Sequence, residues 1–139
     1  MRPDSRLTVA VHALLLLDDA GAERLTSGDI AASVNTNPVV IRRLLGRLME
    51  AGLVAATKGA AGGYRLARPS AEITVWDVYQ TMREEGPFGL HARAPNPRCP
   101  VGRHIQAGLQ DLYGAAESAM KSVLGNTTLR GLRKKLAQG

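Results

Sequence analysis

The sequence has little cysteine and few aromatic residues, and each scarcity excludes a kind of structure. Cys99 is the only cysteine among 139 residues, which excludes an intramolecular disulfide and the usual multi-cysteine zinc site within one chain. Aromatic residues make up 4% of the chain against 45% hydrophobic residues overall, so the core must consist of aliphatic side chains. No apolar run approaches the roughly 18 residues that a membrane span needs, and residues 9–17 lack a signal-peptide cleavage site. We therefore expect a cytoplasmic protein with no membrane partner.

Acidic residues are also scarce in one part of the chain. The whole sequence has 18 Lys and Arg against 12 Asp and Glu, a net charge of +6. Most of this excess lies in residues 35–69, which contain one acidic residue, Glu50, and six basic ones. Such a local excess favours a polyanionic partner, although a solvated face without a partner is the alternative. The six basic residues are Arg42, Arg43, Arg47, Lys58, Arg65 and Arg68, and a second basic cluster of Arg130, Arg133, Lys134 and Lys135 closes the chain.

Two helices are predicted at the start of the chain. Aliphatic residues recur at helical spacing over residues 5–20, where Ser5 can cap the first helix and Gly21 can end it. A second, short helix follows, with Thr26 or Ser27 as N-cap, because a hydroxyl ahead of an apolar run accepts a bond from the first helical turn.

A third helix, predicted over residues 38–51, has the most informative pattern. Asn37 is placed as its N-cap, and Pro38 at the first helical position loses only a donor that would be unpaired anyway. One face is aliphatic and the other carries three arginines. Arginine has a two-pronged donor geometry that matches phosphates and guanine edges, so this face favours nucleic acid. The outward residues are Val39, Arg42, Arg43, Gly46, Arg47 and Glu50.

A basic β-hairpin is predicted next. Short strands at residues 53–57 and 64–67 flank a glycine-rich turn, and Lys58 and Arg65 supply positive charge at its base. The turn lacks the following helix and the lysine–serine or lysine–threonine ending of a nucleotide-binding phosphate loop. Helix, turn, helix and basic hairpin is the order of a winged helix-turn-helix, which we assign to residues 1–70.

The remaining residues, 71–139, are predicted to form a helical region for dimerisation and sensing. It comprises a helix over 74–85, a proline-rich loop over 86–100, a helix of roughly 35 Å over 101–124 and a short basic helix ending at residue 136. The fold class is therefore mainly α with a small β-hairpin.

The long helix carries an apolar seam that so small a domain cannot bury alone. Its positions step by four and three, as in a coiled coil. A second copy of the chain would cover the seam, and helix-turn-helix dimers commonly read two half-sites. A monomer with this helix folded back across the first helix is the alternative. The predicted interface residues are Ile105, Leu109, Leu112, Ala116, Ala119 and Val123.

Several motifs in this chain occur together in one known family. The most specific combination is Ala51-Gly52-Leu53-Val54 with Gly62-Gly63-Tyr64. The further motifs are Leu7-Thr8, residues 26–31, Lys58-Gly59, residues 73–78 and Thr127-Thr128-Leu129. Over nearly its whole length the chain resembles the Rrf2 family of bacterial winged-helix transcriptional regulators, and residues 35–40 and 99–102 resemble the YwnA-like subgroup.

This resemblance implies a homodimeric repressor, in some members an activator, that binds a palindromic DNA operator. It also implies a response to redox state, nitric oxide, iron–sulfur status or cysteine supply. Many members hold a cluster through three cysteines in the loop before the dimer helix, whereas this sequence has only Cys99 there. A cluster would need a cysteine from each subunit with other ligands such as His91 or His104, and such mixed ligation is rare. No cofactor and no metal site is therefore predicted.

Cys99 itself is a candidate redox sensor. It directly precedes Pro100 and is placed as the N-cap of the long helix, where the helix dipole, Arg98 and Arg103 favour a thiolate that oxidants can modify. A cysteine packed as a small apolar residue is the alternative. A thiol-dependent enzyme that uses Cys99 as its nucleophile, and a module that binds a metabolic enzyme, are alternative functions that leave the basic segment unexplained.

The sequence therefore predicts a sequence-specific DNA-binding regulator rather than an enzyme. Arg42 and Arg43 are expected at base edges. Asn37 and Val39 project from the start of the same helix, the part that enters a major groove. The residues expected at phosphates are Thr26, Ser27, Arg47, Lys58 and Arg65.

Overall fold

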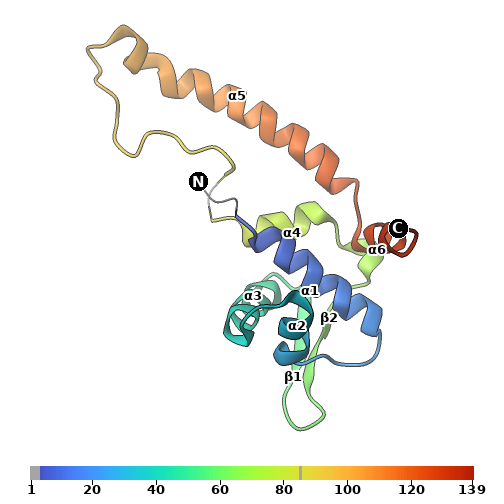
Figure 1. Cartoon of the computed structure of the whole chain (residues 1–139). Helices are drawn as coiled ribbons and strands as arrows, with labels where there is room; N and C mark the ends of the chain where they lie inside the picture. The colour runs from blue at the N-terminus through green and yellow to red at the C-terminus, as the bar shows by residue number, and fades with distance from the viewer. Residues whose placement is uncertain (1–3, 85) are drawn as a thin grey trace.

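A computed structural model describes residues 4–84 and 86–139 of the chain (Figure 1). Within these residues three α-helices come first, a hairpin follows, and a short 3-10 helix and three more α-helices come after it. The elements are α1 (Arg6–Ala20), α2 (Ser27–Val34), α3 (Pro38–Glu50), β1 (Val54–Thr57), β2 (Gly63–Leu66), η1 (Ser70–Glu72), α4 (Val75–Met82), α5 (Pro100–Gly125) and α6 (Leu129–Ala137). The prediction of a mainly α protein with a small hairpin and a long C-terminal helix is confirmed.

Three local predictions need correction. The helix expected over residues 74–85 ends at Met82, because Arg83 adopts an extended conformation with φ −75° and ψ 140°; Glu85 lies outside the described residues. The long helix begins one residue earlier than predicted, at Pro100. Ser5 occupies the N-cap position of α1 without a side-chain cap bond, and Asp4 instead accepts a bond from the backbone N–H of Arg6 at 2.9 Å.

The core is aliphatic, as the shortage of aromatic residues required. Leucines and alanines of α1 pack against the inner face of α3. The same buried cluster includes residues that follow the hairpin, so the core runs across the predicted boundary at residue 70, and that boundary stays a prediction. The cluster comprises Ala10, Ala13, Leu14, Leu17, Ile30, Ala31, Ile41, Leu44, Leu45, Leu48, Leu53, Val54, Ile73, Val78, Met82 and Leu129.

The hairpin is held by the antiparallel pairing of its two strands and by two hydrogen bonds to the segment before α2. Val54 pairs with Leu66 and Thr57 with Gly63 in an antiparallel ladder. Tyr64 exchanges two backbone hydrogen bonds with Leu25, at 2.8 and 3.2 Å. The ring of Tyr64 is half-buried and packs against the core, so the hairpin is held against the helices rather than standing alone.

The helix α5 extends away from the other helices, with the proline-rich loop running beside it (Figure 1). Its C-terminal half is tied to α4 by an ion pair between Arg83 and Glu117. Trp76 of α4 is 8% exposed and its ring lies 5.1 Å from that of Tyr79. Across the described ranges, no helix is both long and apolar enough to cross a membrane.

Candidate nucleic-acid interface

The first turn of α3 is presented to solvent. Asn37 is its N-cap, as predicted, and its Oδ1 atom accepts a bond from the backbone N–H of Val39 at 2.8 Å. Pro38 occupies the first helical position. Val39 and Val40 are 48% and 46% exposed, which is a large exposure for two aliphatic residues side by side. The start of α3 therefore offers exposed apolar side chains, while Asn37 accepts from the backbone N–H groups of its first turn.

The arginines lie on the outer side of α3, as its periodicity predicted. Val39, Arg43, Gly46 and Glu50 are spaced by four, three and four residues and form one strip along the helix; we call it the outer strip. Arg42 and Arg47 flank the strip on either side. Arg42 and Arg43 are exposed and Arg47 is half-buried. The opposite face of α3 is buried, so the helix is held firmly while its outer strip stays accessible; the buried residues are Ile41, Leu44, Leu45 and Leu48.

The start of α2 lies next to this arginine face. The Nη1 atom of Arg42 is 3.4 Å from the Oγ atom of Ser27. Thr26 and Asp29 form a capping box: the Thr26 hydroxyl accepts from the N–H of Asp29 at 3.0 Å, and the Asp29 carboxylate accepts from the N–H of Thr26 at 2.9 Å. The backbone bond from Thr26 lowers the pKa of Asp29. Between α2 and α3, Asn35 takes the left-handed conformation with φ 64°.

The hairpin supplies the other predicted cations. Lys58 begins the turn and Arg65 lies on β2; both are exposed, and the Nη1 atom of Arg65 donates to the carbonyl of Leu66 at 3.2 Å. The glycines of the turn have a role within the chain. A Cβ atom on Gly63 would lie 2.7 Å from the carbonyl oxygen of Leu25, so close backbone approach requires glycine there.

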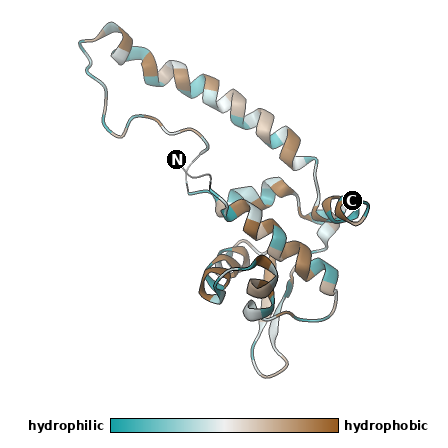
Figure 2. Cartoon of the chain, viewed as in Figure 1, coloured by the Kyte–Doolittle hydropathy of each residue, from teal (hydrophilic) through white to brown (hydrophobic). Residues whose placement is uncertain are grey.

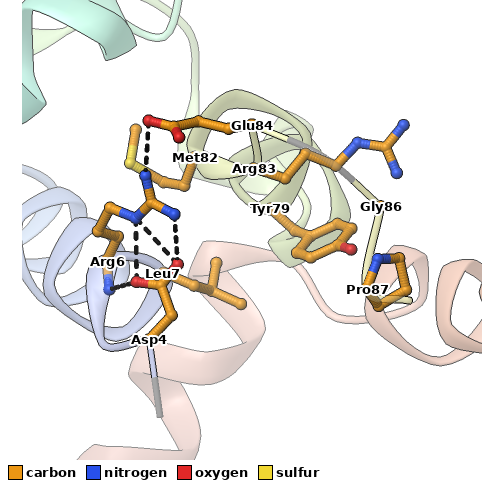
Figure 3. A pocket seen from close by; sticks show the side chains of 9 residues that line it. All are labelled: Asp4, Arg6, Leu7, Tyr79, Met82, Arg83, Glu84, Gly86 and Pro87. Carbon is orange, nitrogen blue, oxygen red and sulfur yellow. Dashed lines mark hydrogen bonds and ion pairs between the residues drawn. The ribbon is translucent and has the colours of Figure 1, made fainter. Parts of the chain in front are cut away.

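Arg47 has an acidic neighbour that sequence analysis did not anticipate. Glu84, which follows α4, lies 3.0 Å from Arg6 and 3.9 Å from Arg47. Arg6 also binds Asp4, and this bond lowers the pKa of Asp4 to about 2. These residues, apart from Arg47, line a hollow of about 440 Å³ between the start of α1 and the end of α4 (Figure 3). Part of the positive charge of Arg47 is therefore balanced within the chain.

Cys99 lies far along the chain from this face, at the start of α5. It is exposed, and it is the N-cap residue as predicted, with its Sγ atom accepting from the backbone N–H of Gly102 at 3.4 Å. His12 is half-buried on α1. Its Nε2 atom lies 3.1 Å from the Oγ atom of Ser33 and links α1 to α2.

The predicted seam of α5 is only partly open. Its members Ile105, Leu109 and Ala116 are half-buried, since the loop packs on that side and Phe88 stacks on Tyr113 with ring centroids 4.8 Å apart. The most exposed aliphatic residues lie one step around the helix, and brown residues recur along α5 in Figure 2. We call Val101, Gly108, Leu112, Ala115, Ala119 and Val123 the α5 strip; all six are exposed.

Two charged contacts near the site had no sequence signal of their own. Glu84 reaches Arg47 across 37 residues of chain, and Arg133 of the basic helix α6 lies 3.3 Å from Asp18 of α1. Neither pair has the spacing of residues on one helix. For the first of them, the sequence shows only two neighbouring acidic residues at positions 84 and 85, which do not indicate a particular arginine.

The fold and this face define a class, the winged helix-turn-helix transcriptional regulators, which bind DNA. A model of the Rrf2 family, described as an iron-dependent transcriptional regulator, matches residues 4–135. The chain belongs to the Rrf2 family. This membership confirms the resemblance and places the chain among regulators rather than enzymes.

Individual relatives agree with this membership. YwnA of Bacillus subtilis, named as a candidate helix-turn-helix transcriptional regulator, is 37% identical over 96% of this chain and 98% of its own length. The transcriptional regulator IscR of Cereibacter sphaeroides is 32% identical over 91% of this chain and 81% of its own. The crystal structure of a candidate transcriptional regulator from Lactobacillus plantarum superposes with a TM-score of 0.80, at 27% identity, covering 96% of this chain and 90% of that one.

The family description names iron, but the residues of this chain do not fit an iron site. Cys99 is the only thiol. Among residues 4–84 and 86–139, no three His, Cys, Asp or Glu side chains lie close enough together to hold a metal ion. One exposed cysteine falls short of the three or four strong ligands that iron–sulfur clusters need. No step of the function proposed below therefore passes through iron.

Proposed function

We propose that this protein acts as a homodimeric repressor that places α3 in the major groove of a palindromic DNA operator. Arg42 and Arg43 read base edges, and Val39 contacts the methyl group of a thymine. Asn37 holds the first turn of α3 in place. The residues proposed to bind phosphates are Thr26, Ser27, Arg47, Lys58 and Arg65. A dimer seated on its operator would block transcription, and this role belongs in the cytoplasm.

One observation carries this proposal: α3 is anchored on one side and carries exposed arginines on the other. Four aliphatic residues hold its inner face in the core, while Arg42 and Arg43 stay exposed. Within the described residues, the side chain of Arg43 has neither an ion-pair partner nor a hydrogen-bond partner. A rigid helix with an unpaired guanidinium in the middle of its outer face supports recognition of base edges.

The experiment is a fluorescence-anisotropy titration on a duplex that the wild-type protein selects from a random pool. Arg43→Ala is expected to cost about 1–3 kcal/mol and to relax the preference at one base position. Arg93→Ala, in the exposed loop before α5, removes the same charge away from the face and should leave affinity within about twofold. A loss that is equal on every sequence would instead assign Arg43 to phosphate. Binding without salt dependence would contradict DNA recognition altogether.

The α5 strip supports self-association. Val101, Leu112 and Val123 are 70%, 61% and 68% exposed, and their spacing suits a two-helix contact. Gly108, Ala115 and Ala119 between them are small enough for close approach of a second helix. Two copies joined along α5 would carry two α3 helices to two half-sites.

We also propose Cys99 as the residue that couples DNA binding to oxidation. Its exposure and its place at the start of α5 support this role, because modification there changes the N-terminus of the helix that joins the two copies. Oxidant is expected to weaken binding of the wild-type protein to the selected duplex and to spare Cys99→Ser. Equal weakening of both proteins would refute the role of Cys99 and leave DNA binding intact.

A further inference from the structure

Gly46 stands in the middle of α3, where glycine destabilises a helix relative to alanine. Nothing in the described residues explains it. A Cβ atom built at Gly46 meets no atom within 4 Å, and the backbone there does not adopt a positive φ. An alanine would therefore fit the folded chain without strain and would favour the helix.

Two other glycines of the chain have internal reasons, whereas Gly46 has none, like Gly108 and Gly114 within α5. Gly46 differs from those two in its place on the outer strip of α3, beside the arginines. Gly52 follows α3 with φ 77°, and Gly63 has φ 150° and faces the carbonyl oxygen of Leu25. At both positions the backbone conformation or a close contact disfavours a side chain. Neither restriction applies at Gly46.

The position of Gly46 indicates what approaches it. It belongs to the outer strip, one turn after Arg43 and one turn before Glu50, on the side of α3 that faces away from the core. A helix with its side chains is about 10–12 Å wide, and the major groove of DNA is about 12 Å wide. A helix in that groove has little clearance, so a missing side chain on its outer strip lets the backbone lie deeper.

We infer that Gly46 is the point where the backbone of α3 lies closest to the base edges in the major groove, and that its missing side chain sets the depth at which Arg43 reaches a base. This inference rests on the proposed DNA-binding function and deepens it. Gly46 is a positioning residue in this scheme: it makes room, and Arg43 makes the contact.

The test compares stability and DNA affinity in a series of glycine substitutions. Gly46→Ala and Gly46→Leu are the probes. Gly114→Ala and Gly114→Leu are matched controls, because Gly114 also lies within a helix and its Cβ would likewise meet nothing within 4 Å. Gly114 is exposed, Gly46 is half-buried, and Gly114 lies off the α5 strip. Each variant is measured by thermal unfolding and by anisotropy on the duplex that the wild-type protein selects.

The expected result is a protein that becomes more stable and binds less well. Gly46→Ala should raise Tm by about 2–6 °C and weaken binding about 5- to 150-fold, as loss of one bidentate base contact would. Gly46→Leu should weaken binding further. Gly114→Ala should raise Tm similarly with affinity unchanged. Because Gly46→Ala remains folded, its loss of binding cannot come from unfolding.

Three outcomes would overturn the inference. Unchanged affinity of Gly46→Ala, while the wild type binds its selected duplex, would refute the close approach and leave the proposed function standing. A loss no larger for leucine than for alanine would mean that α3 needs to bend at Gly46. If the wild-type protein selects no sequence at all, the proposed function fails first and the inference fails with it.

Discussion

Val39 shows that a single exposed side chain can indicate a chemical group of the partner. It is aliphatic, 48% exposed, and stands on the outer strip in the first turn of α3. An apolar side chain at the start of a groove-reading helix is suited to the methyl group of thymine, the one apolar group on a base edge in the major groove. Val39 therefore predicts a thymine at one position of each half-site of the operator.

Replacing the contacted thymine by deoxyuridine removes only that methyl group. Burial of one methyl contributes about 0.8 kcal/mol, so wild-type affinity should fall about threefold to fourfold at one position of each half-site. Val39→Ala should bind both duplexes about equally. The measurement is competition between the two duplexes, and tolerance of deoxyuridine at every thymine would contradict the assignment of Val39.

Asp29 gives a prediction about stability and pH. Its pKa is lowered in the folded protein because the backbone N–H of Thr26 donates to it. A carboxylate with a lowered pKa stabilises the fold above its unfolded pKa, near 4, and this contribution is lost as pH falls through the folded pKa. Wild type should therefore melt above Asp29→Asn at neutral pH, and the difference should shrink in acid. A constant difference in Tm across that range would show that the capping box does not depend on ionised Asp29.

At the scale of elements, the end of α4 is coupled to α3 through charge. Glu84 lies 3.9 Å from Arg47, and both side chains are partly accessible to solvent, so the pair contributes little to stability. The pair instead affects DNA affinity, because a carboxylate beside a phosphate-contacting arginine repels the phosphates of DNA. Glu84 also begins the segment that connects α4 to α5. The carboxylate beside Arg47 therefore comes from the connection to the helix proposed for dimerisation.

Glu84→Gln is expected to tighten DNA binding a few-fold and to steepen its salt dependence by up to about one unit, since Arg47 is then free to neutralise one more phosphate. The measurement is a set of anisotropy titrations at several salt concentrations. Asp111→Asn, on the exposed surface of α5, changes net charge equally and is the control. Equal tightening by both variants would attribute the effect to overall charge rather than to the pair.

At the scale of the whole molecule, the question is what covers α5. The α5 strip is exposed in one chain, and an exposed apolar surface of this kind marks an interaction site. The core itself, which runs from α1 to α6, does not need α5 to be complete. Folding of the core and pairing along α5 are therefore separable properties.

Leu112→Glu should separate them. A charge at the centre of the α5 strip is expected to convert a dimer into a folded monomer, seen by sedimentation velocity with Tm measured in parallel. Affinity for a palindromic duplex should then fall by at least about tenfold, because the two half-sites are no longer bound together. Gln110→Glu, exposed on another side of α5, is the control. A wild-type protein that sediments as a monomer would contradict the proposed dimer.

The sequence alone determined the order of the elements, the N-caps of α3 and α5 and the arginine face of α3. Asn37 and Cys99 cap their helices as local sequence predicted, because a capping bond joins residues two or three positions apart. The outer strip followed from helical periodicity for the same reason. These features depend on near neighbours in the chain, and a single sequence contains them in full.

Only the tertiary structure decided which surfaces stay open and which charges meet. The loop packs on α5 through Phe88 and Tyr113, and only Leu112, Ala119 and Val123 of the predicted seam are exposed. Glu84 approaches Arg47 because α3 and α4 pack on the same core. The open space at Gly46 likewise depends on every element that could have covered it. Such features require the distances between segments far apart in the chain, which periodicity and local propensity do not contain.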